Sequence, residues 1–85
     1  MKRVLKFFSP TCGPCKVMSK NLEEVAKATG VEIQDVDITD EDNESLLDEW
    51  KPRTVPTVIV IDSKDKVHEF KGIVPAQKII EALND

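Results

Sequence analysis

The only two cysteines of this 85-residue chain, Cys12 and Cys15, are separated by Gly13 and Pro14. Two thiols at this spacing suit three kinds of chemistry: a structural disulfide, half of a metal site, or a dithiol that opens and closes during redox turnover. A disulfide across so short a loop constrains the unfolded chain very little. A zinc site needs about four ligands, and only His68, far along the chain, is available to join the cysteines. The pattern therefore favours redox chemistry over a structural or metal-binding role.

A predicted strand and a predicted helix flank this pair. Residues Arg3–Phe8 form a β-branched and aromatic run bounded by Ser9 and Pro10, which is typical of a strand. From Pro14 to Thr29 the apolar residues recur on one helical face; they are Cys15, Met18, Leu22 and Val25. Gly30 follows as the expected helix stop. The pair is thus expected where the strand ends and the helix begins.

This position makes the two cysteines chemically unequal. Cys15 belongs to the apolar face and is expected to be shielded, whereas Cys12 precedes the helix and is expected to be exposed. The unpaired N–H groups and the dipole at a helix start stabilise an anion, which lowers the pKa of the Cys12 thiol. Pro14 suits the start of a helix, and Gly13 adds no side chain where a partner must approach. We expect Cys12 to attack a disulfide and Cys15 to resolve the resulting mixed disulfide.

The rest of the chain alternates between short strands and helices. Residues Val31–Ile38 are predicted to form a second strand, and Thr39 or Asp40 to cap a short acidic helix that ends at Pro52. The inward residues of that helix would be Leu46, Leu47 and Trp50, and we expect Trp50 to be a packing residue.

The C-terminal third of the chain is predicted to hold a hairpin and a last helix. Thr57–Ile61 is typical of a strand buried on both faces, and Val67–Lys71 pairs back with it, which leaves His68 exposed. Pro75 then opens a helix. The resulting order, β-α-β-α-β-β-α, predicts an α/β fold with a four-stranded mixed sheet flanked by three helices, in a single domain over residues 1–85. The first two strands are expected to be parallel because a helix joins them.

Composition excludes several classes of partner. The net charge is −4, and half of the acidic residues lie between Asp35 and Glu49 with no base among them. This balance argues against nucleic acid or an anionic membrane, because phosphate binding needs clustered Lys and Arg. The basic start, Met1 to Arg3, is not followed by a sustained apolar segment, so we expect a cytoplasmic protein, in which a Cys-x-x-Cys pair tends to be catalytic.

The string CGPCK at Cys12–Lys16, preceded by a strand and followed by TVPT at Thr54–Thr57, resembles the thioredoxin family. The resemblance covers nearly the whole chain, through the VDI of Val36–Ile38, the approach from Trp50 to Pro56, the terminal hairpin and the final helix. It implies a thioredoxin-like fold and a disulfide reductase for proteins, with Cys12 as nucleophile and Cys15 as resolver. Pro56 would be a cis-proline facing the pair, and Val55 would offer its backbone to the substrate, beside Thr54 and Thr11.

The resemblance also implies the partners. They would be disulfide-containing proteins and a thioredoxin reductase or equivalent reductant, with the protein acting as a monomer and needing no cofactor or metal beyond the Cys12–Cys15 disulfide. The chain departs from the family in lacking the usual leading strand and helix, and in carrying Thr11 where a tryptophan usually precedes the first cysteine.

Lys6 is the departure with the largest chemical consequence. Thioredoxins commonly carry a buried acid in this strand, thought to accept a proton from the resolving cysteine. One interpretation is that Lys6 extends to solvent and has no role. The other is that its ammonium lies beneath the pair and favours thiolate. Lys16 presents a similar choice between assisting Cys12 electrostatically and being a solvated helix residue.

Two other functions remain compatible with the sequence. One is a glutaredoxin-like enzyme that uses glutathione, although the Gly-Gly and acidic pair expected after the hairpin in such proteins is absent at Phe70–Gln77. The other is an interaction module whose cysteines are incidental.

Overall fold

A computed structural model describes residues 2–84. Met1, the first residue of the basic start, and Asp85 lie outside the described residues. In chain order the elements are β1 (Arg3–Phe8), α1 (Gly13–Thr29), β2 (Ile33–Asp37), the 3-10 turn η1 (Glu41–Asn43), α2 (Glu44–Trp50), β3 (Thr57–Ile61), β4 (Val67–Lys71) and α3 (Ala76–Leu83). The predicted α/β class and the predicted order of strands and helices are confirmed.

The four strands form one mixed sheet in the order β2-β1-β3-β4. As expected, β1 is parallel to β2, and β3 and β4 form an antiparallel hairpin. The register pairs Phe8 with Asp37, Phe7 with Thr57, and Thr57 with Lys71. The C-terminal ends of β1, β2 and β4 therefore meet the N-terminal end of β3 at one edge of the sheet, which we call the active edge.

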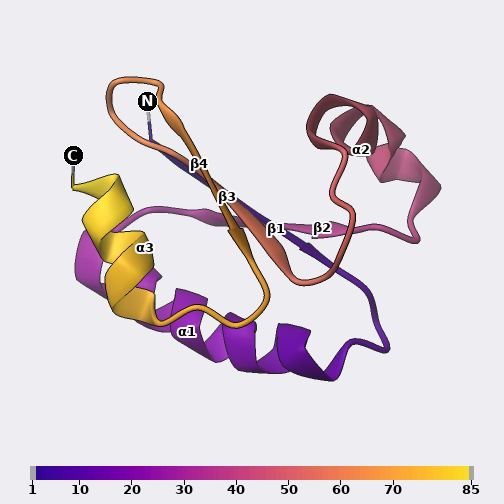
Figure 1. Cartoon of the computed structure of the whole chain (residues 1–85), viewed down its shortest axis with the longest axis horizontal. Coiled ribbons are helices and arrows are strands. Elements are labelled where there is room, and N and C mark those ends of the chain that lie inside the picture. Colours follow the sequence, from indigo (N-terminus) through magenta and orange to yellow (C-terminus); the bar gives the residue numbers. More distant parts are fainter. Residues whose placement is uncertain (1, 85) are drawn as a thin grey trace.

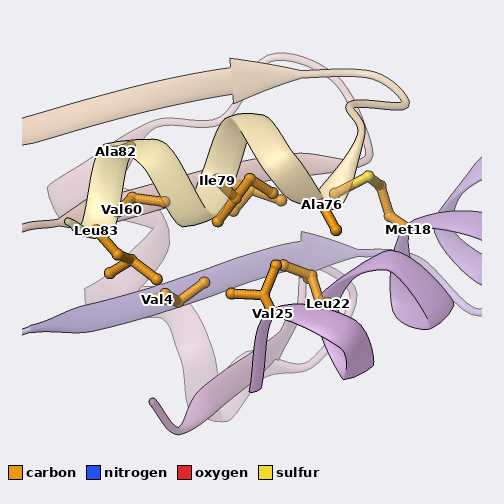
Figure 2. Close-up of a cluster of buried hydrophobic side chains, with 10 residues drawn as sticks. Val4, Met18, Leu22, Val25, Val60, Ala76, Ile79, Ala82 and Leu83 are labelled. Carbon is orange, nitrogen blue, oxygen red and sulfur yellow. The ribbon is translucent and has the colours of Figure 1, made fainter. Parts of the chain in front are cut away.

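The larger hydrophobic cluster lies between the sheet and the helices α1 and α3, which cover the same face (Figure 1). Figure 2 shows Val4 and Val60 of the sheet pointing toward Val25 of α1 and Leu83 of α3. The remaining members of this cluster are Met18, Leu22, Val58, Ala76, Ile79 and Ala82. The apolar face that the sequence predicted for α1 is thus the face that packs on the sheet.

The opposite face of the sheet carries a smaller cluster under α2. Leu5 and Phe7 alternate with Val4 along β1, so their side chains point to this other face, where they pack with Val36, Ile59 and Ile61. Trp50 packs against this cluster, which confirms its predicted role in packing. Helix α2 therefore covers a separate, thinner part of the core.

Several element boundaries differ from the prediction. The second strand covers Ile33–Asp37 rather than Val31–Ile38. The acidic helix begins as a 3-10 turn. The Asp40 side chain caps this turn by accepting from the backbone N–H of Asp42 at 3.0 Å. Among residues 2–84, no helix combines the length and apolar character needed to cross a membrane.

Candidate active site

Cys12 is the N-cap residue of α1. Its backbone is extended (φ −86°, ψ 108°), and its Sγ accepts a hydrogen bond from the backbone N–H of Cys15 at 3.1 Å. The loop before it is closed by the Cys12 N–H, which donates to the Ser9 carbonyl at 3.2 Å. Pro14 occupies the start of the helix, where a missing N–H costs nothing. The sequence around the motif therefore places a sulfur atom at the positive end of α1.

Cys12 and Cys15 form a disulfide, with their Cα atoms 5.3 Å apart. Cys15 is only 3% exposed because it belongs to the buried face of α1, whereas Cys12 is half-buried. Cys15 is shielded, as expected. Cys12 was expected to be exposed and is half-buried instead, but it is still the more accessible residue of the pair. An incoming thiolate thus reaches Cys12 more readily than Cys15.

An open pocket of about 310 Å³ lies beside the disulfide. Its walls come from the end of β1, the loop after it, the first turns of α1 and one residue of β2; they are Lys6, Phe8, Ser9, Pro10, Cys12, Cys15, Lys16, Ser19 and Asp35. The structure therefore brings together four of the residues that the sequence singled out: Lys6, Cys12, Cys15 and Lys16.

Lys6 does not extend to solvent, which corrects the first of the two interpretations above. Its side chain is 6% exposed, and its Nζ donates a hydrogen bond to the Ser19 hydroxyl. The Nζ also lies 3.4 Å from the Asp35 carboxylate and 5.1 Å from the centre of the Phe8 ring. Burial of the ammonium follows from strand alternation, because Lys6 lies on the same face as Val4, under α1.

Ser19 and Asp35 are pocket residues that sequence reasoning missed. Ser19 lies one helical turn after Cys15, and its hydroxyl donates to the Cys15 carbonyl at 3.1 Å. Asp35 is the direct partner of Lys6 in the register of β1 and β2. Opposite charges on two strands that were predicted to be parallel were the available signal for Asp35.

The loop before β3 reaches the active edge without lining the pocket. The peptide bond between Val55 and Pro56 is cis, as the family resemblance implies. Pro56 is buried and Val55 is half-buried, whereas Thr54 and Thr11 are exposed. The Thr57 hydroxyl donates to the Thr54 carbonyl at 2.7 Å and shapes this loop. Because Thr57 pairs with Phe7, the loop lies beside the end of β1, where the cysteine loop begins.

The segment that joins β4 to α3 is fastened at both ends. The Gly72 N–H donates to the Pro56 carbonyl at 2.9 Å, with Gly72 at a φ of 76° that favours glycine. On the other side, the Asn21 side-chain amide of α1 donates to the Val74 carbonyl at 3.0 Å. Between these contacts, Ile73 is 53% exposed. The segment thus presents an apolar side chain close to the active edge.

Asp62 and His68 form a separate hydrogen-bonded pair at the opposite edge of the sheet. The Asp62 side chain is fully buried, and its Oδ2 lies 3.0 Å from the His68 Nε2. The His68 hydrogen bond and the Lys66 backbone N–H lower the pKa of Asp62 to about 2. His68 is 22% exposed, so the prediction that it is simply exposed was wrong.

Within residues 2–84, no group of three or more His, Cys, Asp or Glu side chains is placed to hold a metal ion. Both cysteines are engaged in the disulfide.

The thioredoxin family model matches residues 1–85. The chain belongs to the thioredoxin family. It is 30% identical to the thioredoxin of Pyropia yezoensis over 95% of its own length and 76% of that protein. It is 31% identical to the chloroplastic thioredoxin Y of rice, Oryza sativa subsp. japonica, over 94% of its own length and 48% of that protein. Among solved structures, the short form of thioredoxin f from spinach chloroplast is 30% identical, with a TM-score of 0.76 over 98% of this chain and 73% of that one.

Family membership and the bonded pair together support a general thiol-disulfide oxidoreductase activity. Thioredoxins carry out this chemistry with a redox-active disulfide. The disulfide between the more accessible Cys12 and the shielded Cys15 at the start of α1 is consistent with that chemistry.

Proposed function

We propose that this thioredoxin reduces disulfide bonds in other proteins through a Cys12/Cys15 dithiol-disulfide cycle. The observation that carries the proposal is the asymmetry of the pair: a more accessible Cys12 sulfur that accepts a helix N–H, and a Cys15 sulfur shielded on the buried face of α1. This division supplies one attacking group and one protected resolving group.

In the first step, the Cys12 thiolate attacks a sulfur atom of the substrate disulfide. The substrate bond breaks, one substrate sulfur leaves as a thiolate, and a mixed disulfide forms at Cys12. The N–H of Cys15 and the dipole of α1 favour an anionic sulfur at the N-cap. Pro14 fixes the start of the helix, and Gly13 leaves room for the approaching chain.

In the second step, Cys15 gives up its proton to solvent and attacks the Sγ of Cys12. The mixed disulfide breaks, the second substrate thiolate leaves, and the Cys12–Cys15 disulfide forms. The two Cα atoms are 5.3 Å apart, which is within the range that a disulfide allows. This distance supports direct resolution by Cys15.

The loop of Thr54, Val55 and Pro56 is the proposed contact for the substrate chain. Its position beside the end of β1 supports this role, as does the exposure of Thr54. Thr11, exposed directly before Cys12, would contribute to the same surface.

The oxidised protein must then be reduced again. We propose a thioredoxin reductase or an equivalent dithiol donor as the source of electrons and the reducing environment of the cytoplasm as the location, with the protein acting as a monomer.

The test is an insulin-reduction assay with two alternative electron supplies. One contains NADPH and thioredoxin reductase, and the other contains NADPH, glutathione and glutathione reductase. We expect turnover with the first supply and none above background with the second. Cys12→Ser should abolish turnover, whereas Ser45→Ala, on an exposed position of α2, should leave it unchanged. Cys15→Ser should accumulate a mixed disulfide with insulin that non-reducing electrophoresis detects.

Each contrary result would point to a specific alternative. Turnover with glutathione alone would favour a glutaredoxin-like enzyme. Full activity in Cys12→Ser would overturn the mechanism, and no turnover of the wild-type protein with either supply would favour an interaction module.

A further inference from the structure

Lys6 places a buried ammonium in the wall of the pocket that also holds the disulfide. Cys12, Cys15, Lys6 and Ser19 all line this pocket. Ser19 connects the charge to the redox pair directly, because its hydroxyl accepts from the Lys6 Nζ and donates to the Cys15 carbonyl. The ammonium is therefore held against the turn of α1 that carries the resolving cysteine.

The counter-ion of Lys6 is exposed much more than Lys6 itself. The Asp35 side chain is 58% exposed, whereas that of Lys6 is 6% exposed, and their charged atoms are 3.4 Å apart. Water screens an exposed charge more strongly than a buried one. Asp35 thus neutralises Lys6 incompletely on the pocket side, and the interior of the pocket retains a positive field.

The other charged groups near the disulfide leave this balance positive. Lys16 of α1 is the third charged residue in the pocket wall, beside Lys6 and Asp35. A neighbouring groove of about 170 Å³ shares Lys6, Ser19 and Asp35 and adds Glu23. Glu23 lines that groove but not the pocket of the cysteines.

We propose that Lys6 is a positioning residue that stabilises the thiolate released when the Cys12–Cys15 disulfide is reduced, and that Asp35 limits the strength of this effect. The inference rests on the proposed redox cycle and adds that the charge of Lys6 favours the reduced, dithiol form of the protein. A donor thiolate attacks the Sγ of Cys12, the Cys12–Cys15 bond breaks, and its electron pair leaves on the Sγ of Cys15. The Lys6 ammonium stabilises that anion without transferring a proton.

The consequence is a protein biased toward its reduced form. A positive charge near a sulfur favours the thiolate over the neutral thiol and lowers the pKa of the thiol. The same charge favours opening of the disulfide by a thiol donor. Lys6 therefore acts in the opposite sense to a buried acid at this position, because an ammonium cannot accept the proton of Cys15.

The test compares two variants that remove charges of opposite sign. Lys6→Met removes the charge but keeps a flexible apolar side chain, and Asp35→Asn removes the counter-ion but keeps the shape. Each protein is equilibrated with defined ratios of reduced and oxidised glutathione, quenched with a thiol-alkylating reagent and quantified by mass spectrometry. Thiolate formation is followed separately by absorbance at 240 nm during a pH titration.

We expect Lys6→Met to lower the equilibrium constant for reduction about tenfold, which corresponds to about 30 mV for a two-electron couple, and to move thiolate formation to higher pH. We expect Asp35→Asn to shift both quantities in the opposite direction, by a factor of roughly 2 to 5 because water already screens Asp35. Lys20→Met is the control. It removes the charge of an exposed lysine on α1, the helix that carries Cys15, and should leave both quantities unchanged.

Shifts of the same sign in the two variants would overturn the proposal, as would a lowered melting temperature with unchanged redox equilibrium and titration. These readouts need no protein substrate, so they remain informative if insulin reduction fails. A protein that reduces insulin but shows no opposite shifts would keep the proposed function and lose this inference.

Discussion

At the scale of single residues, Asp62 shows how a turn beside a buried strand stabilises a carboxylate. Its Oδ1 accepts the backbone N–H groups of Lys64 at 2.9 Å and Lys66 at 3.0 Å, and its Oδ2 meets the His68 ring. These contacts all favour the charged form, which is why the pKa falls from 3.8 to about 2 despite complete burial of the side chain. The charge of Asp62 therefore organises the turn between β3 and β4.

This carboxylate makes stability depend on acidity. Because the folded pKa lies below the unfolded one, the contribution of Asp62 is complete above about pH 4 and is lost as the pH falls toward 2. We expect Asp62→Asn to be less stable than wild type at pH 7, with the difference shrinking between pH 4 and pH 2. Urea denaturation at several pH values, followed by the fluorescence of Trp50, the only tryptophan, measures this. A difference that stays constant down to pH 2 would contradict the assignment.

At the scale of elements, α1 connects the cysteine pair to the segment after β4. The Asn21 amide donates to the Val74 carbonyl at 3.0 Å, and the Val74 N–H donates to the Met18 sulfur at 3.2 Å. The segment presenting Ile73 is thus held against the helix that begins at the redox pair. Its other end is attached to the loop of Pro56.

Removal of the Asn21 amide should loosen this connection. We expect Asn21→Ala to lower the free energy of unfolding by about 1 kcal/mol, the usual value for one hydrogen bond, and to speed hydrogen exchange of the Val74 amide. Lys20→Ala, on an exposed position of the same helix, is the matched control and should change neither quantity. Unchanged exchange at Val74 in the Asn21 variant would show that the Asn21 hydrogen bond is not needed to hold the segment.

The elements themselves were largely predictable from the sequence, because their signals are local. The apolar spacing of α1 and its stop at Gly30 predicted a helix that the structure extends by one residue, to Gly13. The second strand was predicted too long, since Val31 and Ile38 continue the apolar pattern beyond the paired residues Ile33–Asp37, although the Ile38 N–H still donates to the Phe8 carbonyl at 2.9 Å. The length of an edge strand is set by its pairing with its neighbour, which depends on register rather than on local sequence.

In the candidate site, too, the features with local sequence signals were predictable and those that depend on tertiary packing were not. Cys12, Cys15 and their unequal exposure followed from helical spacing, whereas the environment of Lys6 did not. Its contact with Asp35 required the register of β1 and β2, and its contact with Ser19 required the packing of α1 on the sheet. Likewise, the contact of His68 with Asp62 depends on how the hairpin aligns these two residues.

At the scale of the whole molecule, the two hydrophobic clusters are unequal. The cluster under α1 and α3 contains ten buried residues, and the cluster under α2 contains five. Helix α2 has no fully buried residue of its own, and the indole N–H of Trp50 is buried without a hydrogen-bond partner among the described residues. Stability should therefore depend more on the first cluster than on the second.

Two truncations of comparable size test this difference. We expect Ile79→Ala, in the fully buried part of α3, to lower the free energy of unfolding by about 2–5 kcal/mol. Leu46→Ala, at a half-buried position of α2, should cost about 1 kcal/mol because less apolar area is lost. Urea unfolding followed by far-ultraviolet circular dichroism measures both. Equal losses would show that α2 contributes as much to the core as α3 does.

The active edge gathers segments that are distant in the sequence. The cysteine loop, the turn after β2, the loop of Pro56 and the segment after β4 meet there only because four strand ends converge. A short synthetic peptide spanning Phe7–Lys16 would contain both sulfurs and the cysteine loop, but not the pocket residues Lys6, Ser19 and Asp35. The folded chain instead presents the same two sulfur atoms in the wall of a pocket that it shares with a buried lysine from another strand.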